Sequence, residues 1–168
     1  VKDYLQNYTK ENKEKFFVSG SPKINLSLLA KDLIKIPNQK SIGFIGRFVG
    51  INTFDGRSCL ENSSRNFLEH DEFMKGARGE IDSLFIYLEI IDYVIKNTDL
   101  IINFRPHPNE KISSYNFLKE KYKNCFIISD PHEDFINWMF RQEKIICTPS
   151  TSIVEVILND IPIISIHK

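Results

Sequence analysis

Short runs of apolar, mostly β-branched residues recur along the 168-residue chain, and this recurrence limits its fold more than any other feature. The runs are continuously apolar rather than alternating, which is typical of strands buried on both faces of a parallel sheet. We expect strands over Phe16–Val18, Ser41–Ile45, Leu100–Phe104, Cys125–Ile128, Lys144–Cys147 and Pro162–Ile166.

Helical patterns separate most of these runs. The clearest has apolar residues three and four apart from Ile81 to Ile95, including Leu84, Phe85 and Leu88, which places one apolar stripe on a helix. Further helices are expected over Ile112–Tyr122, Asp134–Arg141 and Thr151–Leu158. Strands that alternate with helices of this length indicate βαβ units. The sequence therefore predicts a doubly wound α/β domain with a mainly parallel sheet over residues 14–168.

Two stretches do not fit this alternation. Residues 1–13 are rich in Lys, Asn and Glu and read as a linker or a helix that enters from a preceding segment. Residues Arg47–Arg78 show little periodicity and much Gly, Asn, Ser and charge, and connections of such length are usually functional or disordered. The first residue is not Met and the last residues look like a strand, so we expect a fragment of a larger protein.

Charge, hydropathy and cysteine content argue against a role in nucleic-acid binding, against a membrane span and against a cysteine metal site. The 22 basic residues balance 22 acidic ones, so nothing favours nucleic acid or an anionic membrane as the main partner. No apolar run reaches the roughly 18 residues of a membrane span, and no signal peptide is evident. Cys59, Cys125 and Cys147 are widely spaced and suit reduced thiols of a cytoplasmic protein without a metal site.

The segment Asn103–Glu110 is the first candidate for chemistry, because it directly follows an expected strand and ligands of open α/β sheets bind beyond the carboxyl ends of strands. Arg105 can grip a phosphate with two parallel hydrogen bonds. His107 can donate to a phosphate or a leaving-group oxygen, and Pro108 restricts its backbone. The alternative is a turn with a surface Arg and a capping Glu.

The segment Thr148–Glu155 is the second candidate, since it joins another expected strand to a helix. Ser150 is predicted as the N-cap, and Ser150, Thr151 and Ser152 place hydroxyls beside unpaired backbone N–H groups that can bind phosphate. Glu155 lies about one turn further along, where it could reach a ribose diol. A plain capped helix is the equal alternative.

Other motifs carry less weight. Arg47, at the end of Gly43–Phe48, could meet a diphosphate, although a surface Arg after a buried strand explains it as well. We expect a structural turn at Gly20–Asn25 and a polar loop without metal at His70–Glu72. Asp130 or Asp134 is predicted to cap the helix that follows, and Trp138 and Phe140 are predicted to lie in the core.

The order of these motifs resembles bacterial surface-carbohydrate biosynthesis proteins. The matching stretches are Gly20–Asn25, the Arg-Pro-His-Pro-Asn-Glu run at 105–110, the Ser/Thr-rich turn with Glu155, and Asp160–Ser165. The resemblance runs from about Val18 to Ser165 and extends to the nucleotide-binding half of GT-B glycosyltransferases. The His-Pro pair is similar to that of CMP-sugar users, namely bacterial sialyltransferases and retaining β-Kdo transferases of capsule and O-antigen assembly.

This resemblance implies a Rossmann-like three-layer α/β/α domain, one half of a GT-B architecture. It implies that His107 contacts the donor phosphate, that Ser150–Ser152 hold the phosphate and that Glu155 binds the ribose. The implied donor is a nucleotide sugar, with CMP favoured over UDP or CDP, and no obligatory cofactor or metal. The implied acceptor is a glycan or glycolipid at the cytoplasmic face of the inner membrane, which other parts of the protein would contact peripherally.

Three other functions stay open at this point. A non-hydrolysing sugar-nucleotide 2-epimerase and a glycerophosphate transferase of the teichoic-acid type use a similar cleft. A non-catalytic nucleotide-binding or assembly module would share the fold without turnover, and the absence of an evident acid–base pair favours it.

Overall fold

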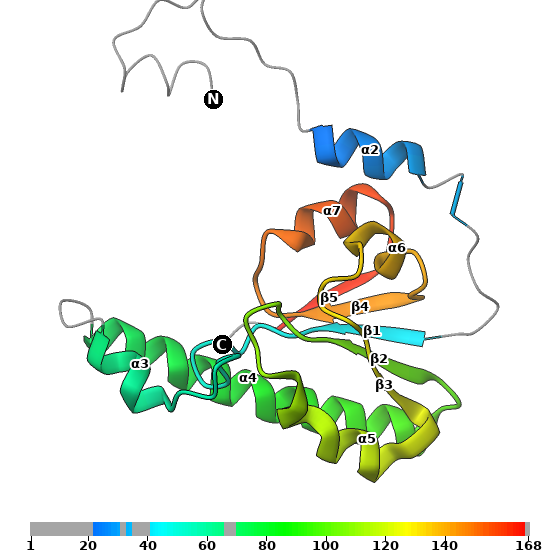
Figure 1. Ribbon diagram of the computed structural model, residues 1–168. Helices are drawn as coiled ribbons and strands as arrows, with labels where there is room; N and C mark the ends of the chain where they lie inside the picture. The colour runs from blue at the N-terminus through cyan, green and yellow to red at the C-terminus, as the bar shows by residue number, and fades with distance from the viewer. Residues whose placement is uncertain (1–21, 31–32, 35–40, 66–69, 167–168) are drawn as a thin grey trace, which may run out of the picture.

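A parallel five-stranded sheet is the centre of the molecule. The computed structural model describes residues 22–30, 33–34, 41–65 and 70–166 (Figure 1). The strand order is β3-β2-β1-β4-β5, and every neighbouring pair is parallel. The strands are β1 (Ser41–Ile45), β2 (Ile101–Arg105), β3 (Phe126–Ile128), β4 (Lys144–Cys147) and β5 (Ile163–Ser165). The predicted strands agree within two residues at each end, and Phe16–Val18 and residues 1–13 lie outside the described residues.

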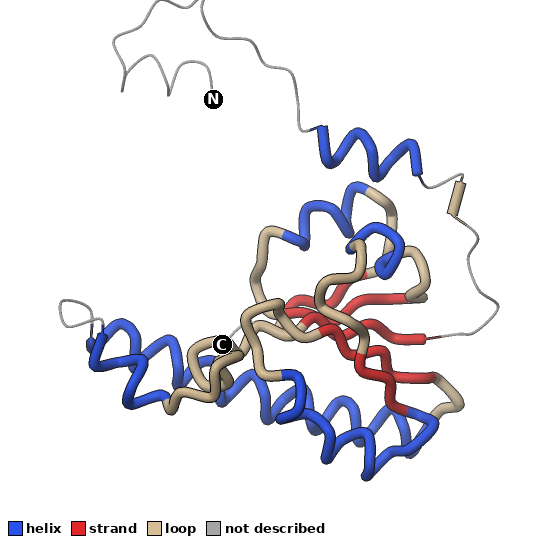
Figure 2. The backbone as a smooth tube through the Cα atoms, in the orientation of Figure 1, coloured by secondary structure: helices blue, strands red, loops and turns tan. Residues whose placement is uncertain are grey.

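Helices cover both faces of this sheet, which confirms the predicted three-layer α/β/α domain (Figures 1 and 2). One face carries α4 (His70–Asn97) and α5 (Asn116–Tyr122), with 3-10 turns at Ile112–Tyr115 and Lys123–Cys125. The other carries α6 (Phe135–Met139) and α7 (Ser152–Leu158), and α2 (Pro22–Ala30) packs on α7. A short α3 (Cys59–Arg65) packs against the start of α4.

Two apolar cores follow from this layering. One lies on the side of α4 and α5 and includes Phe44, Tyr87, Ile102 and Phe126. The other lies on the side of α6 and α7, around Trp138 and Ile145. The prediction that Trp138 and Phe140 are core residues is confirmed, since Trp138 is fully buried and Phe140 is nearly so.

The predicted irregular connection Arg47–Arg78 is wrong over its second half. It contains α3, and α4 begins at His70 rather than near Ile81. This part projects beyond the sheet and packs on the short α3 instead, so it does not need an apolar stripe that covers the sheet (Figure 1). Asp71 and Glu72 stand in the first turn of α4, where their charges favour the helix dipole.

The predicted stripe on α4 is confirmed in part. Ile91 is buried and Leu84, Leu88 and Ile95 pack against the core, whereas Ile81 and Phe85 are exposed and the buried face also includes Tyr87 and Val94. Tyr87 was not part of the predicted stripe; its hydroxyl donates to the carbonyl of Ile45 at 3.0 Å, which satisfies it in the core.

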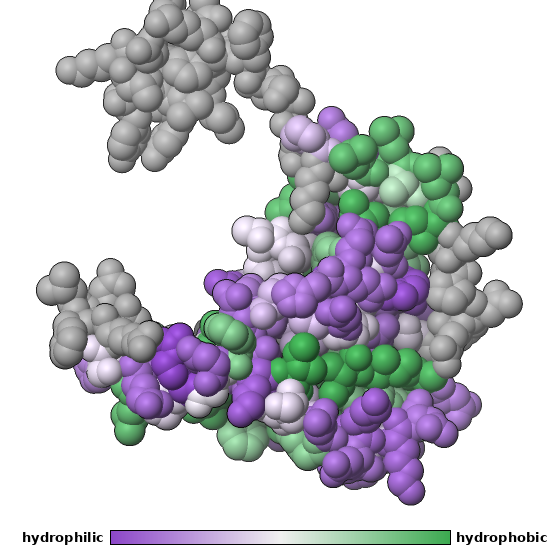
Figure 3. All heavy atoms as spheres, in the orientation of Figure 1, coloured by the Kyte–Doolittle hydropathy of each residue, from purple (hydrophilic) through white to green (hydrophobic). Residues whose placement is uncertain are grey.

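Helix α2 begins where the sequence predicted a turn. Pro22–Asn25 was predicted to be a turn, but it forms the first turn of α2, with Pro22 at the first helical position. The amide of Asn159, at the end of α7, donates to Ser27 Oγ at 2.9 Å and ties the two helices together. Exposed apolar side chains gather over this pair of helices (Figure 3); they include Leu26, Leu29, Val154 and Ile157.

Helix α6 depends on its N-cap. Asp134 Oδ1 accepts the backbone N–H of Asn137 at 2.9 Å, so the predicted cap is confirmed. We expect Asp134→Ala to lower the free energy of unfolding by about 1 kcal/mol, because an orphan N–H loses its partner. Urea denaturation measures this. Asp134→Asn should retain most of the stability, since Asn caps equally well; an equal loss in both variants would contradict the capping role.

No helix in these described ranges combines the length and apolar character that crossing a bilayer requires.

Candidate functional site at the switch point of the sheet

The sheet has a topological switch between β1 and β4. From β1 the chain proceeds to β2 and β3 on one side, whereas β4 and β5 lie on the other side of β1. The loop after β1 leads to α4 on one face of the sheet, and the loop after β4 leads to α7 on the opposite face (Figure 1). Ligands of open α/β sheets bind in the crevice that such diverging loops leave at the carboxyl edge.

Arg47 bridges this crevice. It follows β1, and its Nη1 donates to the carbonyl of Pro149 in the loop after β4. Its side chain is otherwise exposed, so a cation stands between the two loops. The structure therefore brings Arg47 to the same place as the predicted Ser/Thr-rich turn, which the sequence pattern could not establish.

A cavity of about 330 Å³ opens beside Arg47. Thr148 and Pro149 line it from the loop after β4, and α4 lines it with Gly76, Gly79, Glu80 and Ser83. This wall was not predicted from the sequence: Gly76 stands in the stretch Arg47–Arg78 that was expected to be irregular, and no motif singled out Gly79, Glu80 or Ser83.

Glu80 is the acidic group of the cavity. Its Oε2 accepts the backbone N–H groups of Gly50 at 2.8 Å and Ile51 at 3.2 Å, which fixes the carboxyl group against the loop after β1. Burial raises the pKa of Glu80 to about 7, and the charge of Arg47 and the two N–H donors only partly offset this. A carboxyl group that titrates near neutrality in a cleft is a feature of functional sites.

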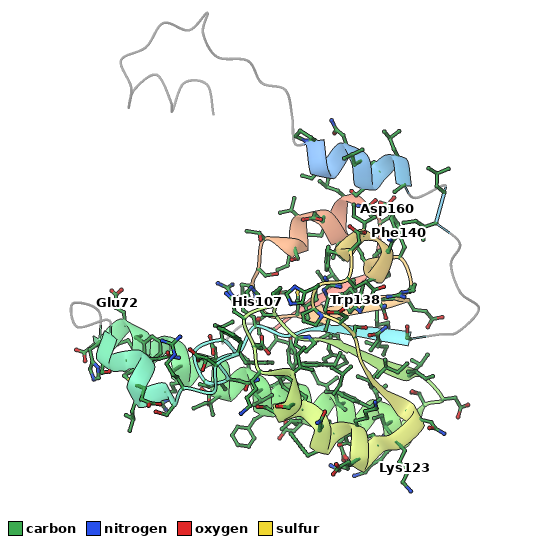
Figure 4. The ribbon with its side chains drawn as sticks, in the orientation of Figure 1. Glu72, His107, Lys123, Trp138, Phe140 and Asp160 are labelled. Carbon is green, nitrogen blue, oxygen red and sulfur yellow. The ribbon has the colours of Figure 1, made fainter. Side chains whose placement is uncertain are left out.

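His107 lies on the loop that leaves β2 (Figure 4). Its Nδ1 accepts the backbone N–H of Asn109 at 3.1 Å, so the neutral ring carries its proton on Nε2. Burial and the nearby charge of Arg47 lower the pKa of His107 below its usual value. The ring is therefore a neutral hydrogen-bond donor at pH 7, and the charge of Arg47 disfavours its protonated form.

Glu110 holds this loop in shape, a role that the sequence analysis did not assign. Its side chain is 2 % exposed. Oε1 accepts the N–H groups of Phe48 at 2.9 Å and His107 at 3.1 Å, and Oε2 accepts the hydroxyl of Tyr115. Glu110 therefore joins the loops after β1 and β2. The motif alone gave no sign that this Glu is buried.

Arg105 points away from the Arg47 crevice. Its guanidinium is buried and donates through Nη2 to the carbonyls of Pro131 and Glu133 in the loop before α6. It also lies 5.6 Å from the ring centre of Phe135 and 5.7 Å from that of Trp138. Nη1 is buried and has no hydrogen-bond partner among the described residues. Arg105 thus anchors the loop between β3 and α6 and does not reach into the Arg47 crevice.

The turn after β4 differs in detail from its prediction. The N-cap of α7 is Thr151 rather than Ser150, and Thr151 makes no side-chain capping bond. The backbone at 150 and 151 already turns helically, with the carbonyl of Ser150 accepting the N–H of Ile153 at 3.2 Å. Ser150 and Ser152 flank this N-cap, and Glu155 is buried on α7, one turn further along.

The described residues include no cluster of three or more His, Cys, Asp or Glu side chains that could hold a metal ion. The His70 ring pairs instead with the hydroxyl of Ser63, between α4 and α3. Cys59, Cys125 and Cys147 are free thiols.

Comparisons with known proteins support the fold. The sequence matches no protein-family model and no curated protein. Two solved structures of UDP-GlcNAc 2-epimerase from Methanocaldococcus jannaschii are similar, one of them in complex with UDP-GlcNAc and UDP. The TM-score is 0.50 for both, at 15 % and 17 % sequence identity, over 97 % and 98 % of this chain. The chain spans 42 % and 43 % of the length of these neighbours.

Proposed function

We propose that this chain is the nucleotide-sugar-binding domain of a GT-B-type glycosyltransferase that builds a bacterial surface polysaccharide. The observation that carries the proposal is the bridge from Arg47 to Pro149 across the switch point, next to His107. A cation and a neutral N–H donor at this edge suit a phosphate, because the sheet's diverging loops leave room for one there.

Each group has a distinct role in this proposal. Arg47 pairs with the phosphate charge, and His107 Nε2–H donates to the phosphate oxygen that becomes the leaving group. Ser150, Thr151 and Ser152 add hydroxyl and N–H donors, Arg105 supports the site indirectly by holding the loop before α6, and Glu155 binds the ribose. Fixed donors aimed at developing negative charge speed departure of the nucleotide without requiring a metal ion.

A sugar-nucleotide 2-epimerase is the second candidate, and the structural neighbours favour it because both are UDP-GlcNAc 2-epimerases. They also support UDP as the nucleotide, whereas the resemblance of the His-Pro loop supports CMP. An epimerase needs no acceptor, whereas the transferase needs a glycan or glycolipid. The chain covers less than half of either neighbour, so both activities are proposals for the whole protein.

Titration of the full chain with UDP, CMP, UDP-GlcNAc and CMP-sialic acid tests the proposed binding. We expect one nucleotide family to bind and Arg47→Ala to weaken it by at least tenfold, because the bridging cation is lost. His107→Ala should weaken it by a smaller factor. Lys119→Ala, an exposed cation on α5, is the matched control and should change nothing. Binding of none of the four, or an unchanged affinity in Arg47→Ala, would reject the proposal.

The reaction is tested separately with the nucleotide sugar that binds. Incubation with a glycan acceptor and without one distinguishes the classes by product analysis. Transfer to the acceptor supports the glycosyltransferase, and inversion at C2 of the sugar without acceptor supports the epimerase. Tight binding with neither product would indicate a non-catalytic nucleotide-binding module.

A further inference from the structure

The cavity between α4 and the switch-point loops has a chemical character that phosphate binding does not require. Arg47 occupies only one side of it, and the opposite side is formed by α4. Its volume of about 330 Å³ is at the small end of the range for ligand pockets, roughly 300–1,000 Å³. The space is therefore large enough for a group attached to the phosphate.

Glycines on α4 keep this space open. Gly76 and Gly79 are one turn apart and both line the cavity. A Cβ added at either position meets no atom within 4 Å, so packing does not require glycine there. Glycine is among the poorest residues for a helix interior. Two of them on one face, without a packing reason, leave room for something beside the helix.

Glu80 supplies an acceptor in the same wall. The two backbone hydrogen bonds of the carboxyl group both go to Oε2, and no hydrogen bond within the described residues uses Oε1. The side chain is thus held in place with one oxygen left for a ligand. A carboxylate is a strong acceptor for hydroxyl groups, and Ser83 adds a hydroxyl one turn further along.

The position of the cavity decides which part of a nucleotide sugar fits. In the proposed function Glu155 binds the ribose from α7, on the face of the sheet opposite α4 (Figure 1). The phosphates lie between these faces, at Arg47. The group on the α4 side must then be attached to the end of the phosphate or diphosphate that is remote from the ribose, and that group is the sugar.

We propose that the α4 cavity is the subsite for the glycosyl group of the donor, with Glu80 accepting hydrogen bonds from the sugar hydroxyls and Gly76 and Gly79 providing its space. This inference rests on the proposed function, since it takes the phosphate position from it. It adds a specificity residue and a steric wall that lie outside the Arg-Pro-His-Pro and Ser/Thr motifs.

The test compares each free nucleotide with its sugar-bearing form, UDP with UDP-GlcNAc and CMP with CMP-sialic acid, by calorimetric titration of the full chain. In the pair that binds, Gly79→Val should weaken the sugar nucleotide at least tenfold and the free nucleotide less than twofold. Gly79→Ala should have an intermediate effect. Glu80→Gln should weaken only the sugar nucleotide, about three- to tenfold, whereas Glu89→Gln, an exposed position on α4, should weaken neither.

The outcomes separate the two proposals. If the unmodified chain binds no nucleotide, the proposed function fails and this inference fails with it. If the chain binds both forms and Gly79→Val affects them equally or not at all, the glycosyl subsite alone is overturned. Undiminished binding of the free nucleotide also shows that each variant is folded, so a loss confined to the sugar form cannot come from unfolding.

Discussion

Trp138→Ala is expected to lower the free energy of unfolding by about 3–5 kcal/mol, the usual cost of removing a large aromatic side chain from a core. Trp138 is fully buried on α6, and its ring stacks on Phe135 with 5.8 Å between ring centres. Its indole N–H donates to Asn103 Oδ1 and Ser129 Oγ, both at 3.1 Å, which ties α6 to β2 and to the end of β3. Truncation leaves a cavity and removes this link.

Urea denaturation of Trp138→Ala and Trp138→Phe measures the two contributions separately. Phenylalanine keeps most of the ring volume but lacks the indole N–H. Without that N–H, Ser129 Oγ still donates a hydrogen bond to Asn103 Oδ1. We therefore expect Trp138→Phe to cost about 1–2 kcal/mol, from one lost hydrogen bond and a small packing defect. Equal losses in the two variants would show that volume is unimportant at this position.

The same ring explains the glycine in β1. A Cβ on Gly43 would lie 2.7 Å from the Trp138 ring and 2.8 Å from the Gln142 side chain, so the strand can approach α6 only without a side chain. Gly46 is similar, since its Cβ would meet the backbone of Pro106 at 3.1 Å. The Gly-x-x-Gly pattern at 43–46 thus serves close packing around the site rather than contact with a phosphate.

The fold was predictable where buried elements show a recognisable pattern of apolar residues in the sequence. β1 and β4 match their predicted bounds because both lie inside the sheet and consist mostly of buried apolar residues. The start of α4 shows no such apolar pattern, because it projects from the domain and packs mainly on α3. The capping role of Asp134 was predictable because caps are local, made within three residues.

The site was less predictable because its contacts are long-range. The sequence placed Arg47, His107 and Ser150–Ser152 after strands, and the strand order alone brings Arg47 to the turn after β4. Whether an Arg turns toward the crevice or the core depends on partners far along the chain. Arg105 finds its partners at Pro131 and Glu133, and Glu80 joins the site through the backbone N–H groups of Gly50 and Ile51, about 30 residues earlier in the chain.

Glu110→Ala is expected to cost about 3 kcal/mol or more, because it removes the acceptor of the Phe48 and His107 N–H groups and of the Tyr115 hydroxyl. Each buried donor left without a partner costs roughly 1–3 kcal/mol. The loop that carries His107 also loses its link to the loop after β1. We therefore expect weaker nucleotide binding in this variant as well, by a factor similar to that of His107→Ala.

Glu110→Gln separates charge from hydrogen bonding through its dependence on pH. Burial raises the pKa of Glu110 above its usual value of 4.5. Between pH 4.5 and this higher native pKa, the native state therefore holds a proton that the unfolded chain has lost. The contribution of Glu110 to stability is therefore complete below pH 4.5 and falls as pH rises through its native pKa. The pKa of Glu80, raised to about 7, gives a slope of the same sign between about pH 4.5 and 7.

Unfolding free energies measured from pH 4 to 8 for Glu110→Gln, Glu80→Gln and the double variant resolve these slopes. Each single variant should reduce the decline in stability, and the double variant should lose the decline and keep the opposite slope from His107, whose lowered pKa makes stability rise with pH up to about its usual pKa of 6.5. The Coulombic interaction between the two carboxyls makes their contributions coupled, so the single effects need not add exactly. A rise in stability from pH 4.5 to 7 that vanishes in Glu110→Gln would mean that its hydrogen bonds outweigh its burial, with the opposite sign of linkage.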